Sequence, residues 1–190
     1  MRGFDLSVFE APLTVPELRS GPVVLRPFAL SDLPLIRQGA TDPYITSITS
    51  VPSVCSDDAG RAYIERQREN AVDGHGFSFV IADAANRARG VGGLGIWLRE
   101  IENGRATIGY WIAPSERGRR LAGWGLRGAV TFAFEVLAIP RLHLFIEPWN
   151  VASQRTALFA GFSHEAFLRG WERVDGEQRD AHSYALLRQE

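Results

Sequence analysis

The stretch Ile108–Gly125, IGYWIAPSERGRRLAGWG, combines an apolar strand, a proline, a turn rich in arginine and glycine, and the start of an amphipathic helix. Such a turn directs several backbone N–H groups and a helix N-terminus at one point, which favours an anion there. Arg117, Arg119 and Arg120 add positive charge around the same point. The stretch therefore predicts a site for a phosphate-bearing cofactor.

Outside this stretch, the composition is that of an ordinary globular protein. The chain has 190 residues, of which 45% are hydrophobic, enough for one domain with a substantial core. Its formal net charge is -1, whereas proteins that coat DNA or RNA usually carry a basic excess, so no nucleic-acid partner is expected. All 21 basic residues are arginine. This excludes a lysine Schiff base and a lysine general base.

The cysteine count and the apolar runs exclude further classes of protein. Cys55 is the only cysteine, so neither an internal disulfide nor a multi-cysteine metal site can form, and no metal is expected. The N-terminus lacks a charged segment followed by an apolar run, so no signal peptide is expected. No apolar stretch approaches membrane-spanning length, so we expect no membrane partner. These absences predict a cytoplasmic protein.

Hydrophobic periodicity and turn residues predict one domain, residues 21–190, after an N-terminal arm, residues 1–20. The arm is expected to pack either on the domain or on a second subunit, so a homodimer stays among the expected partners. Strands are predicted over residues 23–28, 77–82, 90–98, 106–113, 141–147, 165–174 and 179–187. Helices are predicted from Ser31 onward and over residues 56–72, 119–137 and 151–160, with a loop over 42–54.

The order of these elements predicts an α/β fold, in which a mixed sheet carries helices on both faces. The strand 106–113 and the strand 141–147 are joined by a long helix. Two such strands can pair in parallel through a right-handed crossover. No repeat, low-complexity tract or domain linker interrupts the pattern.

Several short motifs resemble the GNAT superfamily of N-acyltransferases. Arg117–Ala122 resembles its acyl-CoA-binding signature, Gln/Arg-x-x-Gly-x-Gly/Ala, with Arg120 in place of the central glycine. Gly109–Trp111, Asn150-x-x-Ser153 and Gly161-Phe162 are similar to the Rim-type branch, which includes the acetyltransferases of ribosomal-protein N-termini. The resemblance covers residues 22–188 by element order. It implies a single-domain GNAT-like fold with a mixed, mostly antiparallel sheet.

The resemblance also implies acetyl-CoA or another acyl-CoA as co-substrate, without a metal. The residues expected to bind it are Trp111, Ile112, Ala113, Arg117, Gly118, Arg119, Arg120, Leu121, Ala122, Gly123, Asn150 and Ser153. Backbone N–H groups of the turn would meet the pyrophosphate at the helix N-terminus. An arginine at position 120 is compatible with this where its side chain points away or contacts a phosphate itself.

Two polar residues at the start of the helix 151–160 are expected to take part in cofactor binding and catalysis. Asn150 is expected to cap this helix and, by resemblance, to contact the pantetheine arm of the cofactor. Ser153, which the resemblance places near the reacting thioester, is the predicted catalytic residue and a possible proton donor to the leaving thiolate.

The general base is left open by the sequence. Rim-type relatives often carry a glutamate where this chain has Thr107, and a threonine cannot replace that carboxylate as a base. The other titratable candidates are His75, Glu100, Glu102, His143, Glu147, His164 and His182. Glu147 ends a strand beside the expected cleft, and strand alternation places His143 on the same face. A base is unnecessary if an acceptor amine of low pKa binds already neutral.

Together these observations predict an acyl-CoA-dependent N-acyltransferase that moves an acetyl group to a primary amine by direct attack in a ternary complex. The acceptor is either a protein N-terminus or a small molecule. An enzyme that uses a succinyl or longer acyl donor instead of acetyl is the alternative enzymatic activity, because the chain has many arginines. A catalytically silent acyl-CoA sensor is the alternative from another class, favoured by the missing strand carboxylate. An unrelated nucleotide-binding domain is disfavoured because no Walker-type Gly-Lys-Thr/Ser sequence occurs.

Overall fold

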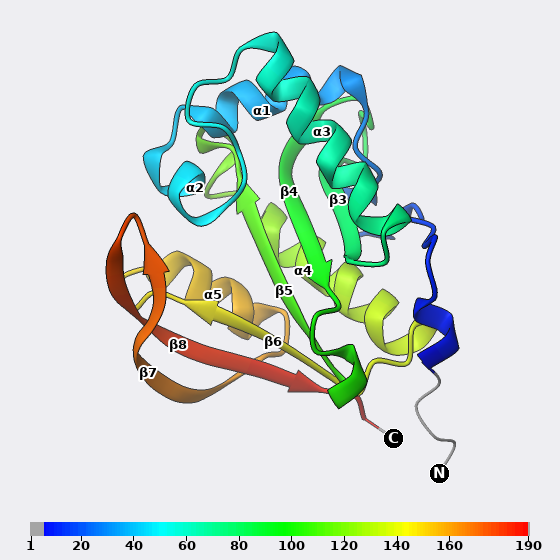
Figure 1. The fold of residues 1–190 in the computed structure, drawn as a ribbon, viewed down its shortest axis with the longest axis vertical. Helices are drawn as coiled ribbons and strands as arrows, with labels where there is room; N and C mark the ends of the chain where they lie inside the picture. Colours follow the sequence, from blue (N-terminus) through cyan, green and yellow to red (C-terminus); the bar gives the residue numbers. More distant parts are fainter. Residues whose placement is uncertain (1–5, 190) are drawn as a thin grey trace.

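The computed structural model describes residues 6–189, which contain one eight-stranded sheet in the order β1-β2-β3-β4-β5-β6-β8-β7 (Figure 1). The strands are β1 (Leu18–Ser20), β2 (Val23–Arg26), β3 (Gly76–Asp83), β4 (Gly90–Trp97), β5 (Arg105–Ile112), β6 (Arg141–Ile146), β7 (Ser163–Val174) and β8 (Glu177–Leu187). The α-helices are α1 (Leu33–Ala40), α2 (Pro43–Ile48), α3 (Asp57–Val72), α4 (Leu121–Thr131) and α5 (Val151–Phe159). Short 3-10 turns occur at Leu6–Phe9, Leu30–Asp32, Ile101–Asn103 and Pro114–Glu116, and a π-helical turn, Phe132–Val136, extends α4.

Neighbouring strands run antiparallel except β5 and β6, which pair in parallel. This confirms the predicted mixed, mostly antiparallel sheet and the predicted parallel pair. The parallel pairing is confined to Arg105–Thr107, which lie opposite Arg141–His143. Beyond these residues the two strands diverge, as Figure 1 shows. The divergence leaves the carboxyl end of β5 without a neighbour on its β6 side.

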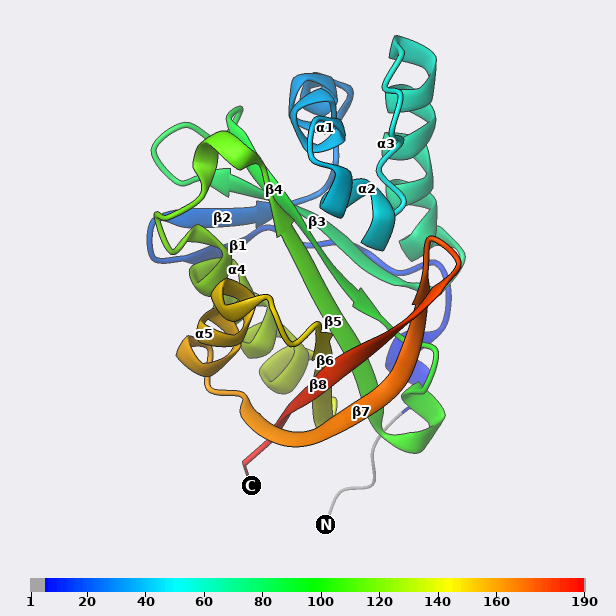
Figure 2. The ribbon, with the colours of Figure 1, turned by 90° about the vertical axis from the view of Figure 1, so that its left-hand side faces the viewer.

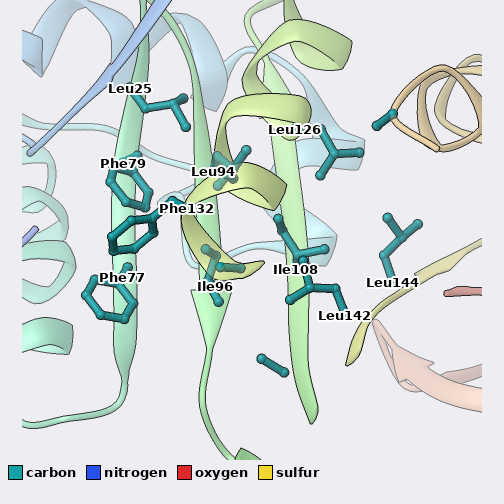
Figure 3. Close-up of a cluster of buried hydrophobic side chains, with 14 of the residues drawn as sticks. Leu25, Phe77, Phe79, Leu94, Ile96, Ile108, Leu126, Phe132, Leu142 and Leu144 are labelled. Atoms are coloured by element: carbon teal, nitrogen blue, oxygen red, sulfur yellow. The ribbon is translucent and has the colours of Figure 1, made fainter. Parts of the chain in front are cut away.

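Hydrophobic cores cover both faces of the sheet, which confirms the predicted helices on both faces. On one face, Leu126 of α4 belongs to a buried cluster with Phe79, Ile96 and Ile108 (Figure 3). On the other face, buried residues of α1 and α3 form a cluster that includes Trp111 of β5. Figure 2 shows α4 and α5 on one side of the sheet and α1, α2 and α3 on the other.

The segment 42–54, predicted as a loop, contains the helix α2, so that prediction is wrong over Pro43–Ile48. Asp42 caps this helix, because its Oδ1 accepts the N–H groups of Tyr44 at 2.8 Å and Ile45 at 3.3 Å. Pro43 takes the first helical position, where a missing N–H costs nothing. Ile45 is buried and holds the helix to the second core. A capping aspartate before a proline is a helix-start signal that the sequence already contained.

The predicted helix 119–137 begins later in the structure, at Leu121. Arg120 has a left-handed backbone with φ of 58°, and Gly118 has φ of 78°, so neither residue can belong to the helix. The first helical hydrogen bond runs from Trp124 N to Arg120 O at 3.3 Å. Helix α4 therefore begins two residues later than apolar periodicity predicts.

The predicted arm, residues 1–20, packs on the domain over the residues that the structure describes. Leu18–Ser20 forms β1, an unpredicted edge strand that pairs with β2. Leu13 N donates to the carbonyl of Ala71 at 2.8 Å and ties the arm to the end of α3. Residues 1–5 lie outside the described part of the chain. The division into an arm and a domain at residue 21 stays a prediction.

Candidate functional site

A cavity of about 940 Å³ opens where β5 and β6 diverge. Its walls come from α2, the end of β5, the turn before α4, the first turn of α4, and α5. Of the residues predicted to bind the cofactor, it brings together Trp111, Ile112, Arg117, Gly118, Arg119, Arg120, Leu121, Ala122, Gly123, Asn150 and Ser153. Ala113 does not line the cavity. It is fully buried, and its N–H donates to the carbonyl of Val91 at 3.0 Å in the sheet.

The first turn of α4 presents unpaired backbone amides to this cavity. The N–H groups of Leu121, Ala122 and Gly123 have no helical acceptor, because the first helical bond begins at Trp124. Within residues 6–189, no side chain caps this end of the helix. Gly123 has no side chain, and a Cβ there would meet the ring of Phe159 at 2.6 Å. The glycine thus allows α5 to approach and close the cavity beside an anion-binding helix end.

The arginines around this helix end differ in how far they are already neutralised. Arg117 pairs with Asp42, with 2.5 Å between Nη2 and Oδ2, and Arg119 pairs with Glu116 at 2.6 Å. Within residues 6–189, the guanidinium groups of Arg120 and Arg155 make no hydrogen bond or ion pair. Both arginines line the cavity. They leave two positive charges available to an anionic ligand.

Arg120 should cost the fold some stability, because its left-handed backbone suits glycine better than any residue with a Cβ. We expect Arg120→Gly to raise the free energy of unfolding by about 1 kcal/mol, measured by urea denaturation. Arg120→Ala, which removes the same side chain but keeps the Cβ, is the control and should show no such gain. Equal effects of the two variants would mean that side-chain charge, not backbone strain, sets the change.

Tyr110 joins the end of β5 to α5. Its hydroxyl donates to the carbonyl of Ser153 at 3.3 Å, and burial raises the pKa of Tyr110. Asn150 caps α5 as predicted, because its Oδ1 accepts the N–H of Ser153 at 3.1 Å. The hydroxyls of Tyr110 and Ser153 therefore lie on one side of the cavity, and the Ser153 hydroxyl can donate a proton there.

The amide of Ile112 points into the opening between the two strands. Ala113 N bonds to Val91 on β4, and in an antiparallel ladder successive residues turn their N–H groups to opposite sides. The N–H of Ile112 is therefore directed away from β4. Its carbonyl faces the same way and accepts the Arg117 Nε at 3.3 Å. An N–H at this place can donate to an oxygen that becomes negative during a reaction.

A narrower pocket of about 90 Å³ meets the cavity at Ile48, Tyr110 and Trp111, which line both. It lies over β4 and β5 on the face covered by α1–α3, and Gly93, Gly95 and Gly109 form part of its floor. None of its lining residues carries a charge. The two openings together give access to the carboxyl end of β5 from both sides of the sheet.

Asp42, which caps α2, and Tyr44 and Ile48 of α2 line the cavity and were missed, because residues 42–54 were predicted as a loop. Tyr44 packs against Trp149 with ring centroids 4.6 Å apart, and burial raises the pKa of Tyr44 to about 12. The Asp42-Pro43 pair was the signal that could have placed this helix. Tyr110 was also missed, although its place in the strand Gly109–Trp111 put it at the expected cleft.

The candidate bases do not gather in the cavity. Glu147 accepts the indole N–H of Trp149 at 2.9 Å and pairs with Arg179 at 3.3 Å. His143, predicted on the same strand face as Glu147, lies at the paired end of β6, where its Nε2 is 2.8 Å from the Thr107 hydroxyl. The other candidates likewise lie outside the cavity lining: His75, Glu100, Glu102, His164 and His182. No cluster of three or more metal-ligating side chains occurs within the described residues.

Comparison with known proteins agrees with this architecture. The family described as the acetyltransferase (GNAT) domain matches residues 23–163. RimJ from Mycobacterium smegmatis, solved in complex with CoA-disulfide, has a TM-score of 0.75 and 26% identity. The match covers 93% of this chain and 88% of that protein. No curated protein sequence matches the chain.

Two more distant structures share the fold. A GNAT-family acetyltransferase from Bacillus anthracis has a TM-score of 0.78 and 16% identity, covering 92% of this chain and 100% of that one. The ribosomal-protein-S5-alanine acetyltransferase from Vibrio fischeri has a TM-score of 0.75 and 13% identity. This match covers 92% of this chain and 98% of that one.

Proposed function

Because this chain belongs to the GNAT acetyltransferase family and is an acyl-CoA-dependent N-acetyltransferase, we propose that it acetylates an α-amine. The observation that carries the proposal is the uncharged narrow pocket, which meets the larger cavity at Tyr110 and Trp111. Acetyl-CoA enters from the larger cavity, and the amine enters from the pocket. The acceptor is a protein N-terminus or a small molecule with a small, uncharged group beside the amine.

The first turn of α4 is the proposed site of the CoA pyrophosphate. The unpaired amides of Leu121, Ala122 and Gly123 and the free guanidinium groups of Arg120 and Arg155 match a polyanion. Arg117 and Arg119 are engaged with carboxylates, so their contribution to binding is smaller. Trp111, Ile112, Asn150 and Ser153 line the part of the cavity that would hold the pantetheine arm and the thioester.

The proposed reaction is direct attack of the amine nitrogen on the thioester carbonyl carbon. The N–C bond forms, the C–S bond breaks, the thiolate takes up a proton and the nitrogen loses one. The N–H of Ile112 donates to the carbonyl oxygen as its charge develops. Ser153, the predicted catalytic residue, supplies the proton to the thiolate, and Tyr110, whose hydroxyl donates to the Ser153 carbonyl, positions it. The raised pKa of Tyr110 keeps its hydroxyl protonated at neutral pH.

Acetyl is the proposed acyl group, with succinyl as the alternative. Ile48, Tyr110 and Trp111, at the junction of the two openings, bear no charge. A succinyl carboxylate buried there would need a positively charged partner. The free arginines, Arg120 and Arg155, are instead assigned to the phosphates. Thiol release from acetyl-CoA with an amine panel separates an enzyme from a silent sensor, for which release is absent.

Binding of acetyl-CoA should depend on charge at the cavity wall. Ala152 lines the cavity at the first turn of α5, and its exposed neighbour Val151 does not. We expect Ala152→Asp to weaken acetyl-CoA binding about tenfold by isothermal titration calorimetry, because the added charge faces a polyanion. Val151→Asp places the same charge in the same helical turn and is the control, with little change expected. Equal losses in both variants, or no binding by the wild type at millimolar acetyl-CoA, would contradict the proposed site.

A cytoplasmic location, a homodimer and the absence of a nucleic-acid partner stay predictions. Among residues 6–189, no helix is both long enough and apolar enough to cross a membrane.

A further inference from the structure

The ring of Trp97 lies directly on two glycines in the floor of the narrow pocket. Gly95 and Trp97 lie on the same face of β4, because side chains alternate along a strand. A Cβ at Gly95 would be only 2.6 Å from the Trp97 ring. Gly109 of β5 pairs with Gly95, and a Cβ there would be 3.0 Å from the same ring. The ring therefore occupies space that side chains at these two positions would otherwise fill.

The ring of Trp111 covers the adjoining part of the floor, where the pocket meets the larger cavity. It is enclosed between β4 and α1, because a Cβ at Gly93 would be 2.6 Å from its Nε1 and a Cβ at Gly39 would be 2.9 Å from its ring. Trp111 is only 7% exposed, so its place is fixed. Gly109 is two residues from Trp111, which is about 7 Å along the strand. The Trp97 ring thus begins about one side-chain length from the junction of the two openings.

Trp97 forms the exposed end wall of the pocket, whereas the aromatic residues around it are buried. Phe28 and Tyr63 line the same pocket at 4% and 3% exposure, and their rings pack edge to face with centroids 5.8 Å apart. Trp97 is 37% exposed, and within residues 6–189 its indole N–H makes no hydrogen bond. The pocket holds only about 90 Å³. Its length is therefore set by the position of the Trp97 ring.

We propose that Trp97 is a specificity-determining residue, which restricts the acceptor to amines with a short side chain on the carbon beside the nitrogen. The proposal rests on the proposed function, which places the attacking nitrogen where the pocket meets the cavity, at Tyr110 and Trp111. From there the side chain of a first residue extends along β5 toward Gly109. Glycine, alanine and serine side chains end before the Trp97 ring, whereas leucine and phenylalanine side chains overlap it. The overlap moves the nitrogen away from the thioester and lowers kcat/KM.

The test compares three peptides, Xaa-Gly-Lys(acetyl)-Gly with alanine, leucine or phenylalanine first, at saturating acetyl-CoA. For the wild type we expect kcat/KM to be about 30-fold lower for the leucine and phenylalanine peptides than for the alanine peptide. Trp97→Ala removes the end wall and should bring the three peptides within a few-fold of one another, mainly by improving the two longer ones. The KM for acetyl-CoA should not change, because Trp97 does not line the larger cavity. Differences in amine pKa cancel, because each variant is compared with the wild type on the same peptides.

Trp171→Ala is the matched control, because Trp171 is also an exposed tryptophan and lines neither opening. It should keep the wild-type discrimination. Trp97→Phe leaves a smaller ring and should give an intermediate ratio, which provides a second measurement should Trp97→Ala fail to fold. Equal kcat/KM for the three peptides in the wild type, or wild-type discrimination in both Trp97 variants, would overturn the inference, as would an equal change in Trp171→Ala. Absence of transfer to all three peptides by the wild type would instead overturn the proposed function, and this inference with it.

Discussion

At pH 7 an α-amine is expected to be acetylated a few hundred times faster than a lysine ε-amine in the same peptide. The pKa of an α-amino group is about 7.7–8.0, so roughly a tenth of it is neutral, whereas the lysine pKa is about 10.4. The structure adds no carboxylate at the pocket that would deprotonate a lysine.

Two isomeric peptides measure this preference. Ala-Gly-Lys(acetyl)-Gly offers only its α-amine, and acetyl-Ala-Gly-Lys-Gly offers only its ε-amine, with the same length and composition. The ratio of their kcat/KM values at pH 7 should be on the order of several hundred and should shrink as the pH rises toward 10. Faster transfer to the ε-amine at pH 7 would refute the assignment of the acceptor. A ratio that does not vary with pH would show that recognition, not amine ionisation, sets the preference.

Asp32→Ala is expected to destabilise the fold by about 3–5 kcal/mol, the largest stability effect that we predict. Asp32 is 2% exposed and binds the guanidinium of Arg26 through both oxygens, at 2.8 and 2.6 Å. It also accepts the N–H of Ala29 at 2.8 Å, which fixes the entry to α1. Removing the carboxylate leaves a buried arginine without its counter-ion. Urea denaturation measures the loss.

An exposed ion pair supplies the control for this prediction. Glu17 pairs with Arg87 at 2.9 Å on the surface, and Glu17→Ala should change stability by less than about 1 kcal/mol. In the double variant Arg26→Met, Asp32→Ala, no charge is left unpaired, so part of the loss should be recovered. A loss below 1 kcal/mol for Asp32→Ala would show that water reaches Arg26 and replaces the carboxylate.

Local signals in the sequence were sufficient to predict most elements and most of the residues that line the larger cavity. The turn 117–123 lies between a strand and a helix, so its residues meet at one helix end wherever the fold places that end. Asn150 could be identified as a cap because capping depends only on neighbours within one helical turn. The Asp175-Gly176 turn likewise joins β7 and β8 through adjacent residues. The missed helix α2 had a local signal as well, in Asp42-Pro43.

Only the tertiary structure brought together residues that are distant in the chain. Thr107 and His143 are 36 positions apart and meet because β5 and β6 pair in parallel over three residues before they diverge. Periodicity gives the face on which His143 lies but not the register that sets its partner. The Arg117–Asp42 pair and the Arg26–Asp32 pair depend in the same way on where separate elements pack. The sequence by itself determined the turn that can hold a phosphate. Packing decided which arginines remain free for it and which hydroxyl meets a histidine, because these depend on distances that no local pattern encodes.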